Sequence, residues 1–195
     1  MTDWTFNKIR KFKVAENLAL DIMHDIFEGV ACYALQKILT TLIFVDNIID
    51  LETLNNKIKN FNYTDFELNN KPRLLTTDSK IVKQIKIKQS ASEMLCLCQY
   101  LGLMIGEFIN KENEDWLYYC VLRKIIGIVT APSYSPFDII HVEALIQKFN
   151  TLFIKLYREL PPKAHFLTHI PRNMRQNGPL IHFWCMKFER KNTSC

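Results

Sequence analysis

The sequence contains few residues that form turns or break helices, with five glycines and seven prolines among 195 residues. Because Gly and Pro interrupt regular structure, their scarcity favours long helices. Hydrophobic residues make up 48% and charged residues 23% of the chain, a balance that excludes a disordered or collagen-like protein. We therefore expect a mainly α protein.

The sequence also lacks obvious membrane and secretion signals. Its longest uncharged stretch, residues 94–106, is shorter than the roughly 20 apolar residues of a membrane span. Residues 1–21 include basic residues, but no apolar run and no small-residue cleavage site accompany them. These absences predict an intracellular protein that is not secreted and has no membrane partner.

Several catalytic signatures are missing as well. The chain has no Gly-rich phosphate loop, no G-x-S-x-G elbow and no zinc-finger spacing. Among its six cysteines the only close pair is the C-x-C of Cys96 and Cys98, which is neither a redox C-x-x-C nor a zinc ribbon. We expect the cysteines to be reduced, buried thiols.

Positive charge is concentrated near the C-terminus. Residues 161–195 contain six basic residues against the single acid Glu189, an excess as large as the chain's net charge of +5. The candidate DNA-binding residues are Lys163, Arg172, Arg175, Lys187, Arg190 and Lys191. A second basic run lies at residues 80–88. We expect it either to contact phosphates or to form a solvated helix face.

Apolar periodicity predicts a multi-helix protein. The expected helices cover residues 18–44, 51–61, 79–109, 116–130 and 139–160, with caps from Asp50 and from Asp78 or Ser79. Pro161 and Pro162 end the last of these patterns. We expect a helical region at 1–160 and a basic C-terminal segment at 161–195, together forming one structural unit.

One polar ridge of the first helix combines Asp21, His24, Asp25 and Glu28, spaced three or four residues apart. Such a ridge can hold or orient a metal ion, or it can simply face solvent. Gly29 interrupts the same helix at a cost of about 1 kcal/mol relative to Ala, which suggests a local requirement for glycine.

Two further candidates lie in the C-terminal segment. His165 and His169 have helical i, i+4 spacing, but no acid or third ligand accompanies them, so packing or a phosphate contact competes with metal binding. Glu189 lies among basic residues, where it either pairs with Arg190 or Arg175 or binds a metal beside a nucleic-acid backbone.

Taken together, two segments resemble the C-terminal half of the transposases of CACTA (En/Spm)-like DNA transposons and their animal relatives. They read ALDIMHDIFEGV and PPKAHFLTHIPRNMRQNGPLIHFWCMKFERK. The resemblance spans residues 15–191, and its specific parts are the two ends.

The resemblance implies a ribonuclease-H-like fold in which two Asp and one Glu bind two Mg²⁺ or Mn²⁺ ions for DNA strand cleavage and transfer. Asp21 and His24 match the family's D-x-x-H motif, which lies in or beside a helical insertion. Glu189 matches the third catalytic acid and metal ligand. The approach to that acid is matched by His165, His169, Gly178, Pro179 and Trp184.

The chain departs from the family because the two catalytic aspartates expected upstream of Asp21 are missing and Glu189 is followed by only six residues. We therefore expect a truncated DDE-type transposase fragment that is inactive alone, holds no metal ion itself, retains salt-sensitive DNA binding and acts in the nucleus. One alternative is an all-helical interaction module that binds a transposase, a host protein or itself. The other is a nuclease in which Asp21, Asp25 or Glu28 replaces the missing acids.

Overall fold

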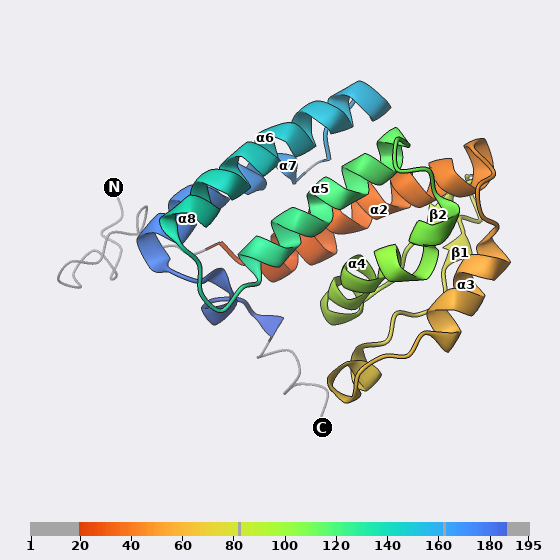
Figure 1. Ribbon diagram of the computed structural model, residues 1–195, viewed down its shortest axis with the longest axis horizontal. Coiled ribbons are helices and arrows are strands. Elements are labelled where there is room, and N and C mark those ends of the chain that lie inside the picture. The colour runs from red at the N-terminus through yellow and green to blue at the C-terminus, as the bar shows by residue number, and fades with distance from the viewer. Residues whose placement is uncertain (1–19, 82, 162, 187–195) are drawn as a thin grey trace.

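The computed structural model describes residues 20–81, 83–161 and 163–186. Most of these residues are helical, and the helices pack around one apolar core (Figure 1). The prediction of a mainly α protein is therefore confirmed. Glu189, Lys187, Arg190 and Lys191 lie outside the described residues.

A single long helix runs through the middle of the protein. It comprises η2 (Met23–Val30), α2 (Ala31–Thr40) and η3 (Thr41–Val45), of which the first and last have π-helical hydrogen bonding. Apolar residues that recur along the predicted 18–44 helix are buried in it, including the adjacent pair Ile26 and Phe27. This helix contacts α4, α5, α7 and β2, so it supports the packing of both ends of the chain.

By length and composition alone, the Met23–Val45 helix could cross a membrane. However, 56% of its most apolar stretch is buried inside the protein, as in the core helix of a soluble protein. The expectation of no membrane partner stays a prediction.

The next helix, α3 (Leu51–Asn60), begins where the sequence predicts it. The Asp50 carboxylate accepts a hydrogen bond from the Thr53 backbone N–H at 2.8 Å, which satisfies a donor in the first turn. A 3₁₀ turn, η4 (Asp65–Asn70), follows. Leu54 and Ile58 turn into the core and fix the side of α3 that faces α4.

The predicted helix over residues 79–109 is wrong in its first third. In this stretch β1 (Thr76–Thr77) pairs antiparallel with β2 (Ile85–Lys86) as a hairpin, and helix α4 (Ala91–Ile105) begins only at the Ser90 cap. Ile85 and Ile87 are buried, so the period is two residues here. A capping box between Ser90 and Glu93 sets the true helix start.

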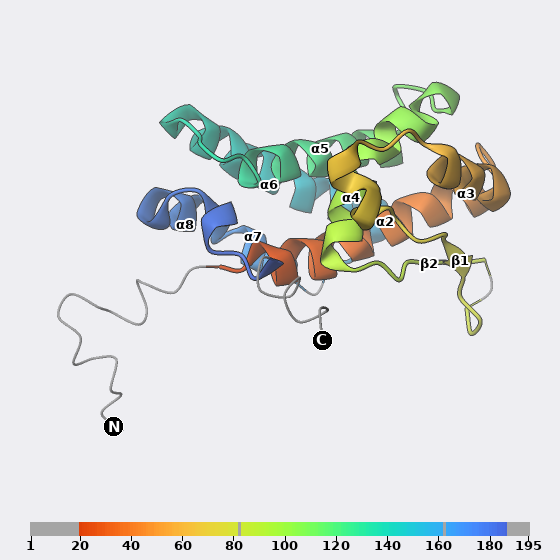
Figure 2. The ribbon, with the colours of Figure 1, turned by 90° about the horizontal axis from the view of Figure 1, so that it is seen from below.

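Two antiparallel helices, α5 (Glu114–Val129) and α6 (Pro136–Tyr157), form a layer over α2 (Figure 2). Their caps are Asn113 and Ser135, and a one-turn 3₁₀ helix, η5 (Gly106–Phe108), precedes α5. Tyr118 stacks on Phe149 with ring centroids 4.6 Å apart, which locks the two helices together.

The chain then returns to the start of the long helix. Helix α7 (Ala164–Leu167) contacts η2, α8 (Ile170–Asn177) packs on α6, and the 3₁₀ turn η6 (Leu180–His182) follows Gly178. Gly178 has a φ of 79°, a conformation that favours glycine. Within the described residues the hairpin is the only sheet, so the ribonuclease-H-like remnant stays a prediction.

Adjacent tyrosines on α5 allow a matched stability test. The Tyr119 hydroxyl donates to the Cys98 carbonyl at 3.0 Å and accepts from the Gly102 N–H at 2.8 Å, whereas the buried Tyr118 hydroxyl has no partner among the described residues. Tyr119→Phe should lower the free energy of unfolding by about 1 kcal/mol, and Tyr118→Phe should leave it unchanged or raise it. Urea denaturation measures both, and equal losses would contradict this account.

Candidate functional site

The first turn of the long helix lies against the C-terminal segment. The Asp21 Oδ1 atom accepts hydrogen bonds from the backbone N–H of Met23 at 3.0 Å and of Cys185 at 3.2 Å. Asp21 and Cys185 are 164 positions apart in the sequence, and both ribbon views show the two segments side by side (Figures 1 and 2). One carboxylate oxygen therefore holds together the two segments that carry the family resemblance.

The other Asp21 oxygen faces His24. Its Oδ2 lies 2.5 Å from His24 Nδ1, and His24 Nε2 lies 3.8 Å from Glu28 Oε2 on the next turn. The Cys185 thiol completes the group: one ligand atom each from Asp21, His24 and Cys185 lie within 4.8 Å of one another. Carboxylate, imidazole and thiol thus converge at one point of the surface, with the His24 side chain 46% exposed.

The two aspartates of the ridge differ in electrostatics. Burial opposes the ionisation of Asp21, but hydrogen bonds from Cys185, His24 and Met23 outweigh it and lower the pKa of this carboxyl. For Asp25, burial is the main effect and raises the pKa, although Lys163 acts in the opposite direction. The ridge is therefore not a uniform solvated face: the protein stabilises the charge of Asp21 and disfavours that of Asp25.

Lys163 explains the glycine in the helix. Its Nζ donates to the His24 carbonyl at 2.9 Å, and a Cβ added at Gly29 would meet Lys163 Cδ at 2.6 Å. The lysine stem therefore crosses the helix so closely that a side chain at position 29 would force the stem to shift. Lys163 and Gly29 also line a hollow of about 280 Å³ together with Glu28, Cys32 and Tyr33.

The other predicted basic and histidine positions are spread over the C-terminal helices. Arg175 Nη2 forms an ion pair with Glu143 of α6 at 2.7 Å, whereas Arg172 is exposed on α8. His165 and His169 are exposed, with ring centroids 6.4 Å apart, and neither belongs to the Asp21 group. Of the six predicted DNA-binding residues, Lys163 and Arg175 thus also make contacts within the protein.

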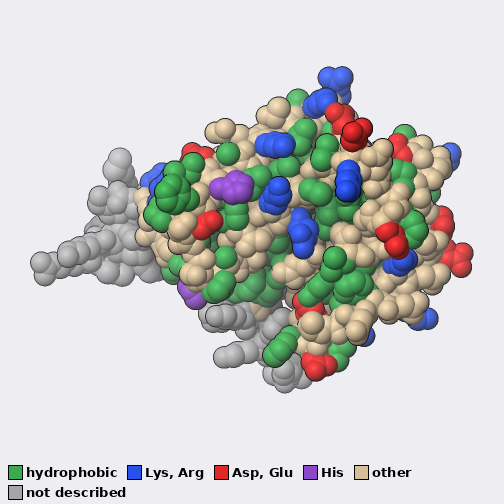
Figure 3. Space-filling view, viewed as in Figure 1, with side chains coloured by type: hydrophobic (Ala, Val, Ile, Leu, Met, Phe, Trp, Pro, Cys, Tyr) green, Lys and Arg blue, Asp and Glu red, His purple; other side chains and the backbone are tan. Residues whose placement is uncertain are grey.

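Basic side chains gather on a second surface that the sequence analysis did not single out. Figure 3 shows Lys and Arg side chains over α5 and α6, and the exposed ones on these helices are Arg123, Lys124, Lys148 and Lys155. Lys155 pairs with Glu114, and Arg123 donates to the Gln99 carbonyl. The spacing of residues along one helix does not predict this surface, because its basic residues come from two different helices.

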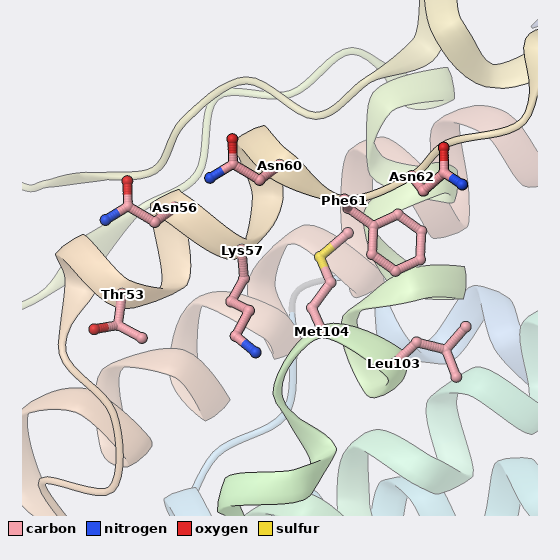
Figure 4. Close-up of a pocket in the computed structure, with 8 residues that line it drawn as sticks. All are labelled: Thr53, Asn56, Lys57, Asn60, Phe61, Asn62, Leu103 and Met104. Atoms are coloured by element: carbon pink, nitrogen blue, oxygen red, sulfur yellow. The ribbon is translucent and has the colours of Figure 1, made fainter.

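An open groove lies between α3 and α4. It has a volume of about 560 Å³, and its apolar residues are Phe61, Leu103 and Met104. Figure 4 shows the polar side chains of α3 along one side, including Asn56 and Asn60. Leu103 is 69% exposed, so the groove presents apolar surface to solvent.

Cys185 is not among the candidate site residues predicted from the sequence, although its thiol lies in the Asp21 group. All cysteines were expected to be buried thiols, which holds for Cys96 and Cys98, while Cys32, Cys120 and Cys185 are only partly buried. One sequence signal points to Cys185: it lies four residues before Glu189, in an apolar stretch of the C-terminal segment.

Comparison with protein-family models, curated proteins and solved structures finds no match for this chain.

The electrostatic difference between Asp21 and Asp25 predicts opposite effects of neutralisation. Because the pKa of Asp21 is lowered on folding, its charge stabilises the protein above pH 3.8 and this contribution is lost as pH falls through the lowered value. In chelator-treated protein, Asp21→Asn should reduce stability at pH 7 and have less effect near pH 3. Asp25→Asn should leave stability at pH 7 unchanged or raise it, because the pKa of that carboxyl is raised. Urea melts at both pH values check this, and equal destabilisation by the two variants would contradict it.

The contact between Gly29 and Lys163 predicts a measurable coupling. Gly29→Ala gains about 1 kcal/mol of helix propensity but meets the Lys163 stem, a steric conflict that costs about 1–3 kcal/mol. We expect a net loss of stability in the natural chain and a smaller loss, or a gain, when Lys163→Ala is also present. A double-mutant cycle from urea melts measures the difference, and strict additivity would refute the contact.

Proposed function

We propose that this chain is a transposase-derived module that binds duplex DNA and does not cleave it. In this proposal it corresponds to the helical insertion and the last catalytic segment of a CACTA-like DDE transposase, including a remnant of the ribonuclease-H-like fold. The observation that carries the proposal is the hydrogen bond from Cys185 N–H to Asp21. It joins the D-x-x-H motif to the segment leading to Glu189, two parts that the resemblance assigns to one catalytic domain.

The donor set argues against catalysis by this chain alone. Two-metal strand transfer needs several carboxylates that hold two Mg²⁺ ions about 3.5–4 Å apart. The cluster in the described residues has one carboxylate, one imidazole and one thiol, whereas Mg²⁺ prefers oxygen ligands in octahedral geometry. This cluster does not fit a two-magnesium centre, so we assign no cleavage step to it.

Charge supports DNA as the ligand. The segment 161–195 carries six basic residues against one acid, and exposed Arg172 lies on it. Lys163 and Arg175 have partners inside the protein, which reduces their freedom to contact phosphates. We therefore assign most of the phosphate contacts to Arg172, Lys187, Arg190 and Lys191.

Fluorescence anisotropy with a labelled duplex tests the proposal. Affinity should fall steeply between low and near-physiological salt, because each phosphate contact contributes about 0.9 to the slope of log K against log salt. The triple variant Lys187→Ala, Arg190→Ala, Lys191→Ala should flatten this slope by roughly two to three units. The control variant Lys57→Ala, Lys59→Ala, Lys71→Ala removes the same charge from around α3 and η4 and should keep the slope.

The same reactions test the absence of catalysis. With Mg²⁺ or Mn²⁺ present, the duplex should remain intact. Cleavage that is abolished by Glu189→Ala would overturn the inactive assignment, and salt-independent or absent binding would overturn the DNA-binding assignment.

The α3–α4 groove favours a second candidate, the all-helical interaction module. Leu103 and Phe61 line an open groove, and exposed apolar surface of this kind is typical of sites that bind a partner. If the module self-associates through the groove, sedimentation will show a dimer that Leu103→Glu dissociates. A monomer at all concentrations would remove self-association from consideration.

A further inference from the structure

We propose that Asp21, His24 and Cys185 bind a single Zn²⁺ ion. This inference does not rest on the proposed function, since it concerns three side chains of the described structure and is tested without DNA.

The geometry brings three different ligand types to one point. Their ligand atoms lie within 4.8 Å of one another, whereas the donors around a tetrahedral zinc ion lie roughly 3–4 Å apart. Small side-chain rotations therefore suffice to close the site. Asp21 Oδ2 and His24 Nδ1 are 2.5 Å apart and joined by a hydrogen bond, so a metal ion bound by both would replace that bond and separate the two atoms slightly.

The chemistry of the donors selects the metal. Thiolate and imidazole suit zinc, and a carboxylate is also a common zinc ligand, whereas Mg²⁺ and Ca²⁺ need oxygen ligands. Three protein ligands are enough for zinc, because the ion accepts water as its fourth ligand. When zinc binds, Cys185 coordinates as a thiolate and the thiol proton passes to solvent.

The backbone around the three ligands is held independently of the metal. The buried Asn173 of α8 accepts a hydrogen bond from the Leu20 N–H at 3.2 Å, and Lys163 holds the His24 carbonyl. Asp21 Oδ1 is already occupied by the Met23 and Cys185 N–H groups, which leaves Oδ2 directed at His24. The ligands thus start near their bound positions, and little ordering is needed on binding.

Zinc at this point would tie the start of the long helix to the C-terminal segment. The cluster joins residues 21 and 24 to residue 185 across most of the chain. A ligand that binds only the folded chain stabilises it by mass action. We therefore expect zinc to raise the unfolding temperature of the whole chain.

Cobalt substitution tests the site. Full-length protein is reduced, stripped of metal with a chelator and titrated with Co²⁺. One equivalent should produce a thiolate-to-cobalt charge-transfer band together with the visible bands of tetrahedral cobalt. Zn²⁺ should abolish the spectrum, and millimolar Mg²⁺ should leave it unchanged.

Variants identify the ligands. Cys185→Ser retains the backbone N–H bond to Asp21 and should lose the charge-transfer band, while the control Cys120→Ser, at a partly buried cysteine of α5, should keep it. His24→Gln should weaken cobalt binding by at least about tenfold. Should Cys185→Ser fail to fold, Cys185→Ala serves the same purpose.

Thermal unfolding gives a second readout. Zn²⁺ should raise the unfolding temperature of the natural chain and of Cys120→Ser, and should have no effect on Cys185→Ser. The proposal is overturned if the natural chain gives no charge-transfer band, or if the band survives in Cys185→Ser. It is equally overturned if zinc leaves the unfolding temperature of the natural chain unchanged.

Discussion

The start of the long helix depends on hydrogen bonds from the opposite end of the chain. A helix begins with backbone N–H groups that have no partner within the helix. Asp21 satisfies one of them, at Met23, and the same oxygen accepts the N–H of Cys185. Asn173 and Lys163 add bonds to Leu20 and to the His24 carbonyl. Because the long helix contacts α4, α5, α7 and β2, this anchoring links the C-terminal segment to several elements of the core.

The same anchoring compensates for the glycine inside the long helix. A glycine in a helix costs about 1 kcal/mol relative to alanine. At Gly29 the missing side chain makes room for the Lys163 stem, whose ammonium reaches the His24 carbonyl. The local cost in propensity is offset by a tertiary contact, and that contact fixes α7 against η2.

Features with local causes could be predicted from the sequence, and features with distant causes could not. Caps at Asp50, Asn113 and Ser135 set helix starts through neighbouring residues, so α3, α5 and α6 lie close to the predicted ranges. The β1–β2 hairpin is not predicted because a short alternation of lysine and isoleucine also fits a helix face. The approach of Cys185 to Asp21 depends on the folding of 164 intervening positions, which spacing arguments do not reach. The family resemblance pairs the segment around Asp21 with the C-terminal segment, but it does not indicate that the Cys185 thiol lies beside Asp21.

The cluster also gives the D-x-x-H pattern of Asp21 and His24 a structural role in this chain. Asp21 contributes to folding through Oδ1 and to the cluster through Oδ2, and the first role requires no metal and no further acid. The hydrogen bonds that Asp21 accepts therefore join two parts of the fold whether or not the chain catalyses a reaction. A cysteine beside this pattern changes the preferred cation from a hard, oxygen-bound ion to a softer one. In the proposed zinc site, the residues that resemble part of a magnesium-dependent enzyme would therefore hold a different ion, because the Cys185 thiol lies beside them.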